Sequence, residues 1–119
     1  MRSIGTEGSA FMNDRLLSLL GLIRRAGKLS MGFDAAADAM GKGEASLLLL
    51  SEELSERTSG AIRKIAEQSK TCVITVKHGM EEIGHAIGRR STGIIAVNDS
   101  GFADKIKTLC AENSQEECI

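Results

Sequence analysis

The sequence predicts an α/β protein, a three-layer α/β/α sandwich built as a single domain. Apolar runs of strand length alternate along the chain with segments whose apolar residues recur at helical spacing. The strand-like runs are apolar at successive positions, which is typical of strands covered by helices on both faces. A chain of 119 residues can bury one core but is too short for two domains with a site between them. The alternation also predicts parallel pairing in part of the sheet.

Two helices are predicted in the first third of the chain. The first begins at Asn13, carries apolar residues at helical spacing between positions 16 and 23, and ends at Gly27. The second covers residues 32–40, is rich in alanine, and ends at a glycine-lysine-glycine sequence. A short strand is expected between them at residues 29–30.

Three strands and three helices are predicted in the remainder of the chain. The strands cover residues 47–50, 71–76 and 92–97. The helices cover residues 55–69, 78–87 and 100–110.

The two ends of the chain are predicted to lie outside the folded domain. Residues 1–12 contain glycines and no apolar period, which predicts a mobile leader, and Met12 is an alternative start. Residues 112–119 predict an acidic, flexible tail, which leaves residues 13–111 as the domain. No apolar run reaches the length of a membrane span or a signal core, so we expect a cytoplasmic protein without membrane contact.

The residues that could carry chemistry do not form a recognisable catalytic or metal site. Three cysteines without a Cys-x-x-Cys spacing argue against a disulfide framework or a zinc site, and Cys72 lies in an apolar run as a predicted core residue. His78, Glu82 and His85 would share one helical face, but this spacing alone is weak evidence for a metal. We therefore expect no enzymatic activity, no metal and no cofactor.

Charge and composition limit the modes of nucleic-acid binding. A net charge of -1 is not that of a strongly basic binder, and three Phe without Tyr or Trp argue against stacking platforms for single-stranded bases. Basic residues nevertheless stand beside glycines at predicted element boundaries: Arg24, Arg25, Lys28, Lys42, Arg89 and Arg90. Such positions can present side chains and backbone N–H groups to phosphates. The alternative interpretation of each is a solvated surface charge.

Four segments, in their order and spacing, resemble a known family. They are residues 28–34 (KLSMGFD), 43–52 (GEASLLLLSE), 83–88 (IGHAIG) and 93–97 (GIIAV). Together they resemble the kink-turn-binding superfamily of ribosomal proteins L-seven-Ae and L-thirty-e over residues 16–109. Residues 98–105 (NDSGFADK) are similar to its bacterial YlxQ-type branch of ribosomal-protein-like RNA-binding proteins. The resemblance implies an α/β/α sandwich with a four-stranded mixed sheet.

The resemblance also implies two segments that contact RNA. Family members hold a kink-turn through a Gly-x-Asn-Glu motif followed three residues later by Lys. Gly32 matches this glycine and Asp34 stands at the Asn position. Ala35 replaces the Glu and Asp38 replaces the Lys. An ionised Asp accepts hydrogen bonds but donates none, so a guanine edge with its N–H donors would suit Asp34. The second segment becomes Arg89-Arg-Ser-Thr92, whose guanidinium groups can stack on a base and pair with phosphate.

We therefore predict a non-catalytic protein that binds structured RNA, either a kink-turn or a bulged helix. Ribosomal or non-coding RNA is the expected partner, together with ribosomal or translation-related proteins. The predicted RNA contacts are Lys28, Gly32, Phe33, Asp34, Lys42, Arg89, Arg90, Ser91 and Thr92.

Two alternatives remain open. A protein-interaction module on the same fold would be favoured by an apolar patch that includes an exposed Phe33. An enzyme acting on RNA or nucleotides would be favoured by a polar pocket containing His78, Glu82 and His85.

Overall fold

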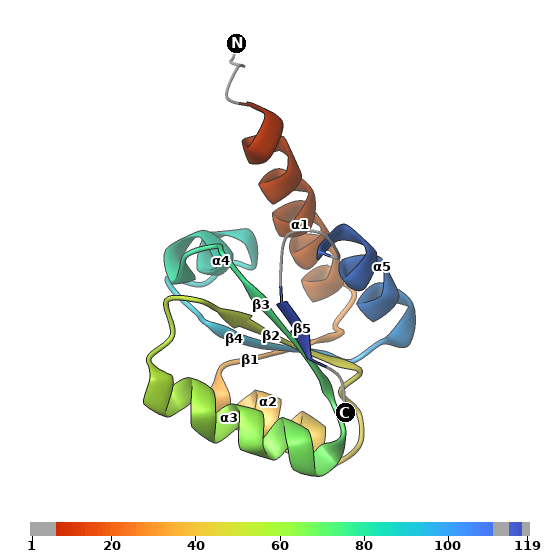
Figure 1. Cartoon of the computed structure of the whole chain (residues 1–119). Coiled ribbons are helices and arrows are strands. Elements are labelled where there is room, and N and C mark those ends of the chain that lie inside the picture. Colours follow the sequence, from red (N-terminus) through yellow and green to blue (C-terminus); the bar gives the residue numbers. More distant parts are fainter. Residues whose placement is uncertain (1–6, 111–114, 118–119) are drawn as a thin grey trace.

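The structure is a computed structural model, and it describes the backbone of residues 7–110 and 115–117 and the side chains of residues 15–110. Helices and strands alternate along most of this length (Figure 1). The helices are α1 (Glu7–Arg25), α2 (Phe33–Gly41), α3 (Glu56–Ser69), α4 (Met80–Ala86) and α5 (Ser100–Cys110). The strands are β1 (Leu29–Met31), β2 (Leu47–Ser51), β3 (Cys72–Val76), β4 (Ile94–Val97) and β5 (Gln115–Glu117).

The strands form one mixed sheet in the order β1-β4-β2-β3-β5. β2 and β3 are parallel, because α3 carries the chain back across one face of the sheet between them. β4 lies antiparallel between β1 and β2. The predicted four-stranded mixed sheet is therefore confirmed, and the short strand β5 joins its edge antiparallel to β3.

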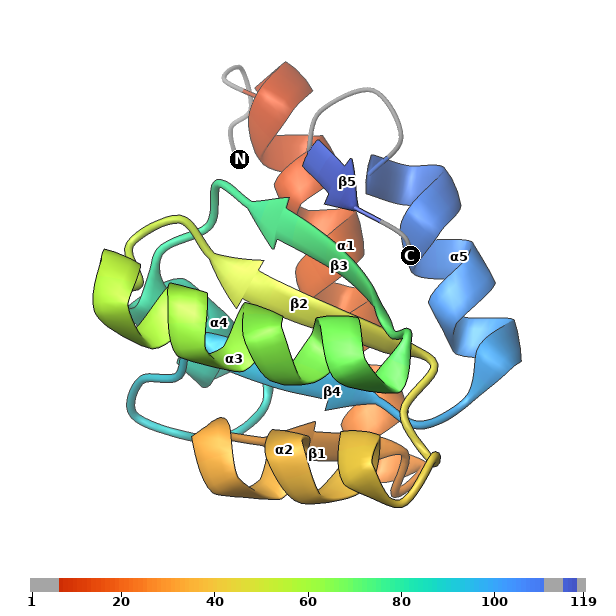
Figure 2. The same cartoon turned by 60° about the horizontal axis from the view of Figure 1, so that its bottom comes forward.

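Helices cover both faces of the sheet, which confirms the three-layer sandwich (Figures 1 and 2). α2 and α3 lie on one face, and α1, α4 and α5 lie on the other. β2 explains why the strand-like runs are continuously apolar. Leu47 and Leu49 belong to the core under α1, α4 and α5, whereas Leu48 and Leu50 belong to the core under α2 and α3. Burying each of these side chains contributes roughly 1.5–3 kcal/mol.

Two helices begin two or more residues away from the predicted positions. α1 begins at Glu7, before the predicted start at Asn13, and so includes part of the segment expected to be a mobile leader. α4 begins at Met80 rather than at position 78. The Glu53 carboxylate accepts from the Met80 N–H at 2.8 Å, and the Glu82 carboxylate accepts from the Gly79 N–H at 2.9 Å. These two bonds satisfy amides at the helix start and fix it after Gly79.

The cysteines differ from the sequence prediction. Cys72 lies in β3 as predicted, but its side chain is half-buried and bonded in a disulfide, so the expectation of a core thiol is wrong. Its position near the sheet edge also brings it within 3.7 Å of the Lys107 ammonium on α5. Cys110 is buried at the end of α5. Residues 111–114 and 118–119, which belong to the predicted tail, lie outside the described residues.

Candidate nucleic-acid interface

The turn between β1 and α2 is built around Gly32. Its φ of 96° and ψ of 167° belong to a region that is essentially restricted to glycine. The Gly32 N–H donates to the Ile94 carbonyl at 2.8 Å, which fastens the turn to the beginning of β4. No side chain caps the start of α2. The first-turn N–H groups of α2 thus retain the capacity to bind an anion or an RNA oxygen.

The loop between α4 and β4 is fixed at both ends by backbone hydrogen bonds. At the end of α4, Gly88 has a φ of 78°, and the Arg89 N–H donates to the Gly84 carbonyl at 2.7 Å. This glycine-terminated helix end turns the chain so that the following residues leave the helix axis. Further along, the Thr92 N–H donates to the Met80 carbonyl at 3.0 Å. The loop is therefore tied to both the first and the last turn of α4.

Gly84 allows this loop to lie directly on α4. A Cβ atom at Gly84 would stand 2.7 Å from the Ser91 amide nitrogen and 2.8 Å from the Arg90 carbonyl carbon. Both atoms belong to the backbone and cannot rotate away as a side chain would. Sequence reasoning did not assign Gly84 to the site, and its only signal was its place in the segment IGHAIG.

A side chain of the loop joins these two segments. The Arg89 guanidinium donates to the Met31 carbonyl at 3.3 Å, directly before Gly32. The same guanidinium lies 3.9 Å from the position that a Cβ atom at Gly32 would occupy. The start of α2 and the α4–β4 loop are far apart in sequence but adjacent in space.

The predicted contacts at this junction differ in how far they reach solvent. Asp34, Arg90 and Ser91 are exposed. Phe33 is half-buried and packs against the core under α2 and α3, so it does not supply the exposed apolar patch that a protein-interaction module would favour. Thr92 is buried, and its amide is already hydrogen-bonded within the protein. Its side chain is therefore not presented to solvent, and the residue anchors the loop.

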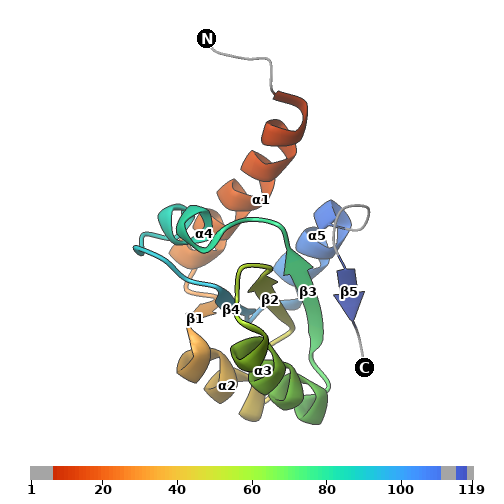
Figure 3. The ribbon, with the colours of Figure 1, turned by 60° about the vertical axis from the view of Figure 1, so that its left-hand side comes forward.

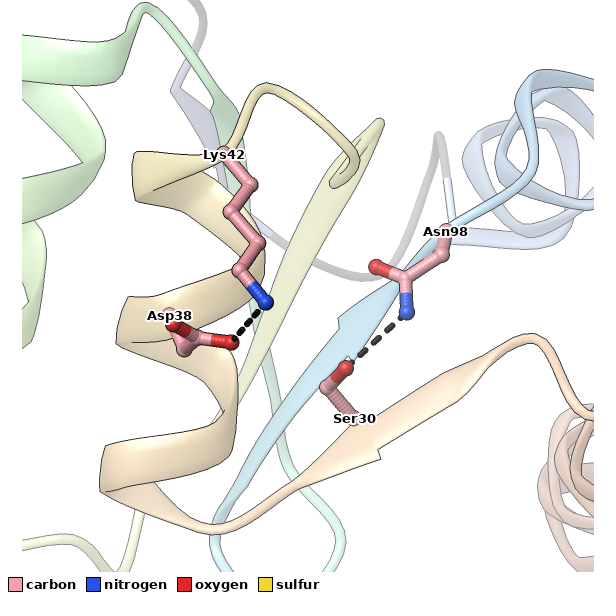
Figure 4. Close-up of polar contacts among 4 residues, drawn as sticks. All are labelled: Ser30, Asp38, Lys42 and Asn98. Carbon is pink, nitrogen blue, oxygen red and sulfur yellow. Dashed lines mark hydrogen bonds and ion pairs between the residues drawn. The ribbon is translucent and has the colours of Figure 1, made fainter.

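Lys28 and Lys42 lie at the other end of β1 and α2. Gly32 is bonded to Ile94, where β4 begins, whereas the Lys28 carbonyl accepts from the Asn98 N–H at 2.8 Å, just after β4 ends. Asn98 also donates to the Ser30 hydroxyl at 2.9 Å (Figure 4). At the rise per residue of a strand and of a helix, the Lys28 backbone lies about 13 Å and the Lys42 backbone about 15 Å from the Gly32 turn. The structure thus divides the predicted contacts between the two ends of β1 and α2.

Lys42 is further distinguished by an ion pair. Its ammonium lies 3.1 Å from the Asp38 carboxylate, one helical turn earlier on α2 (Figure 4). The hydrogen bond to Asp38, the charge of Asp38 and the charge of Glu44 raise the pKa of Lys42 above its usual value. Lys42 is therefore positively charged, but its charge is partly offset by Asp38, the residue that replaces the Lys of the family motif.

A groove of about 620 Å³ runs between α1 and α4. Its lining includes Leu22, which is the large apolar residue most exposed among the described side chains at 53%. Glu82 and His85 also line it, but His78 precedes α4 and its imidazole is buried, so these three residues do not meet in one pocket. Within the described residues no group of three His, Cys, Asp or Glu side chains could hold a metal ion.

The fold and the paired segments define a small α/β/α protein that presents a glycine-capped helix start beside an arginine-bearing loop. The sequence model of the ribosomal protein L7Ae/L30e/S12e/Gadd45 family matches residues 14–113. The chain belongs to this family.

Several relatives match most of the chain. It is 31% identical over 93 residues to the RNA-binding protein YlxQ of Bacillus subtilis, a match that covers 76% of this chain and 90% of YlxQ. It is 28% identical over 91 residues to the large ribosomal subunit protein eL30 of Eremothecium gossypii, covering 76% and 87% of the two chains. A solved structure of a protein of unknown function from Bacillus halodurans has a TM-score of 0.75 and 30% identity, covering 80% of this chain and 95% of that one.

In the part of the chain that the structure describes, no helix combines the length and apolar character needed to cross a bilayer.

Proposed function

We propose that this protein binds structured RNA, without catalysis, through a surface formed by the start of α2 and the α4–β4 loop. The observation that carries the proposal is the hydrogen bond from Arg89 to the Met31 carbonyl, which joins the two segments into one surface. Membership of the L7Ae/L30e/S12e/Gadd45 family supports it, as do the names of the relatives, an RNA-binding protein and a ribosomal protein.

The chemistry of this surface suits an RNA backbone. Arg89 and Arg90 are exposed, and neither forms an ion pair with a carboxylate of the described residues. A guanidinium can bind phosphate with two parallel hydrogen bonds and can also stack on a base. Asp34 stands on the first turn of α2, where its carboxylate can accept from the N–H donors of a guanine edge. The surface therefore combines phosphate contacts with a single base contact.

The expected ligand is a bent RNA helix, a kink-turn or a bulged helix, in a ribosomal or non-coding RNA. In such a ligand, splayed bases and phosphates lie close together. They can therefore contact the start of α2 and the adjacent α4–β4 loop at the same time. We further propose that the protein acts in the cytoplasm beside ribosomal or translation-related proteins.

The exposed Leu22 and its groove favour a second candidate, a protein-interaction module, which would use α1 and α4 rather than the arginine loop. If the protein binds RNA, substitutions in the α4–β4 loop should weaken binding. If it is a protein-interaction module, substitutions on α1 and α4 should weaken binding instead.

The proposal is tested by Arg89→Ala combined with Arg90→Ala in the full chain. The affinity for a kink-turn RNA should fall, and the dependence of log affinity on log salt should become shallower by about two, one for each phosphate that the variant no longer neutralises. Arg57→Ala is the control, because Arg57 is an exposed arginine on α3, an element that belongs to neither of the two proposed RNA-binding segments.

Two results would contradict the proposal. One is a double variant that binds the RNA with unchanged affinity and salt slope. The other is wild-type protein that binds no structured RNA but captures a protein partner in a manner abolished by Leu22→Ser.

A further inference from the structure

The groove between α1 and α4 lies where the backbones of two helices approach closely. A Cβ atom at Gly21 on α1 would stand 3.0 Å from the Ala86 carbonyl oxygen at the end of α4. Figures 1 and 3 show α4 beside α1. Gly21 and Ala86 line the groove together with Ser18. Small residues therefore line the groove at the point where the two helices are closest.

The two helices run in the same direction where they pack. Three residues after Gly21, the guanidinium carbon of Arg24 lies close to the chain that follows α4. It is 3.7 Å from the position that a Cβ atom at Gly88, two residues after Ala86, would occupy. The contacts between the two segments thus advance toward the C-terminal end of both.

This direction places opposite charges at the two ends of the groove. Glu82 lies one helical turn before Ala86 on α4, and Arg25 lies one turn after Gly21 on α1. Both side chains line the groove and are exposed. Neither forms an ion pair with a described residue. Each charge therefore lacks a partner of opposite sign within the described part of the chain.

Leu22 adds an exposed apolar side chain to the same groove. It is 53% exposed, and covering such a side chain is favourable because its apolar surface leaves water. The groove thus has one apolar side chain to bury, small residues on which an apolar side chain can pack, and one charge of each sign. A surface that contains both members of each contact is complementary to a second copy of itself.

We infer that two copies of this chain associate through their α1–α4 grooves, related by a two-fold axis near Gly21. The axis reverses the direction of the second groove, so that Arg25 of each copy lies opposite Glu82 of the other. Leu22 of each copy then packs on the small residues of the other groove. This inference goes beyond the proposed function, because the groove belongs to neither the start of α2 nor the α4–β4 loop.

An amphipathic helix of another protein is the alternative occupant. Such a helix would need an apolar face but no particular order of charges. The reversed order of charges that the groove requires is present on a second copy, which favours self-association. Eight residues line the groove, against about 20–30 on each side of a stable interface. The dimer should therefore be weak and form only at high protein concentration.

Sedimentation velocity of the full chain at increasing protein concentration tests the inference. The wild type should shift from monomer to dimer as the concentration rises toward about 1 mM. Leu22→Glu should weaken dimerisation at least about tenfold, because it places a carboxylate in an apolar contact. Ala61→Glu is the matched control and should dimerise as the wild type does, because Ala61 is exposed on α3, which does not line the groove.

An exchange of charges between two variants tests how the copies are arranged. Arg25→Glu and Glu82→Lys should each dimerise poorly, because both pairs in either dimer then join like charges. In an equimolar mixture of the two variants, both pairs join opposite charges again, so the mixture should dimerise as the wild type does. Glu82→Lys also removes the carboxylate that accepts from the Gly79 N–H. Thermal melts of both variants therefore set a temperature at which each is folded.

Four outcomes would overturn the inference. They are a wild type that stays monomeric up to about 1 mM, Leu22→Glu protein that dimerises as the wild type does, an equal loss for Ala61→Glu, and a mixture of the charge variants that dimerises no better than either alone. RNA binding by a wild type that stays monomeric would refute this inference and leave the proposed function intact. A dimer that binds no structured RNA would do the reverse.

Discussion

Gly84 on α4 lies directly beneath Ser91, so closely that a Cβ atom on the glycine would stand 2.7 Å from the Ser91 amide nitrogen. The α4–β4 loop, which carries Arg89 and Arg90, can lie against α4 because Gly84 has no side chain to separate them. A helix-interior glycine costs stability relative to alanine, and here the close approach of the loop offsets that cost.

We predict that Gly84→Ala displaces the loop and weakens RNA binding. The new methyl group must push the backbone of Arg90 and Ser91 outward, which should cost about 1–3 kcal/mol. The higher helix propensity of alanine recovers up to about 1 kcal/mol of this. Chemical denaturation should therefore give a modest decrease in stability, and an RNA titration should give a larger decrease in affinity.

Gly60→Ala is the matched control for this substitution. Gly60 also lies inside a helix, α3, but a Cβ atom there would meet nothing within 4 Å. This variant should gain up to about 1 kcal/mol of stability and bind RNA as the wild type does. If Gly84→Ala gained as much as Gly60→Ala, the loop would not depend on the missing side chain.

Asp34→Asn should change stability and RNA affinity in opposite directions. The Asp34 carboxylate lies in the first turn of α2, where a negative charge is favourable by about 0.3–1 kcal/mol, so its removal should lower the melting temperature slightly. The amide of Asn can both donate and accept and does not repel phosphate, so binding to a kink-turn should tighten. Paired thermal melts and titrations measure both effects. Unchanged affinity would remove Asp34 from the interface.

Lys42→Ala should affect RNA binding less than Arg89→Ala does. Lys42 lies at the far end of α2 and is paired with Asp38, whereas Arg89 lies at the junction of the two segments. Asp38→Asn should release Lys42 from its pair and raise RNA affinity only slightly. Filter-binding titrations of the three variants measure these differences. A decrease in affinity for Lys42→Ala as large as that for Arg89→Ala would extend the interface along the whole of α2.

Lys70→Gly should stabilise the protein. Lys70 follows α3 with a φ of 58° and a ψ of 42°, a left-handed conformation that strains any residue with a Cβ atom by about 1–2 kcal/mol. Glycine removes this strain but adds unfolded-state entropy, which leaves a net gain of roughly 0.5–1 kcal/mol. Lys70→Ala keeps the Cβ atom and should give no gain. Equal melting temperatures for the two variants would show that the strain is negligible.

Most of the fold could be predicted from the sequence, because buried strands and helices have recognisable patterns of apolar residues. The run from Leu47 to Leu50 is continuously apolar because its alternate residues belong to two different cores. Gly27 ends the first helix where predicted. The start of α4 was not predictable, because it depends on the Glu53 carboxylate, which comes from a distant turn.

The site is only partly predictable, because sequence order gives no distances between segments. The family motifs placed Gly32 and Arg89 in separate segments, and the structure brings them together. Lys28 is only four positions from Gly32 in sequence, yet an extended strand separates the two. The position of Arg24 against Gly88 depends on how α1 packs on α4, which no local pattern encodes.

The sheet is flanked by two very short edge strands, β1 and β5, of three residues each. A short edge offers few unpaired N–H and C=O groups to another molecule, whereas β3 without β5 would present a five-residue edge. Removing the last residues of the chain should therefore favour lateral association of monomers and lower solubility at high protein concentration.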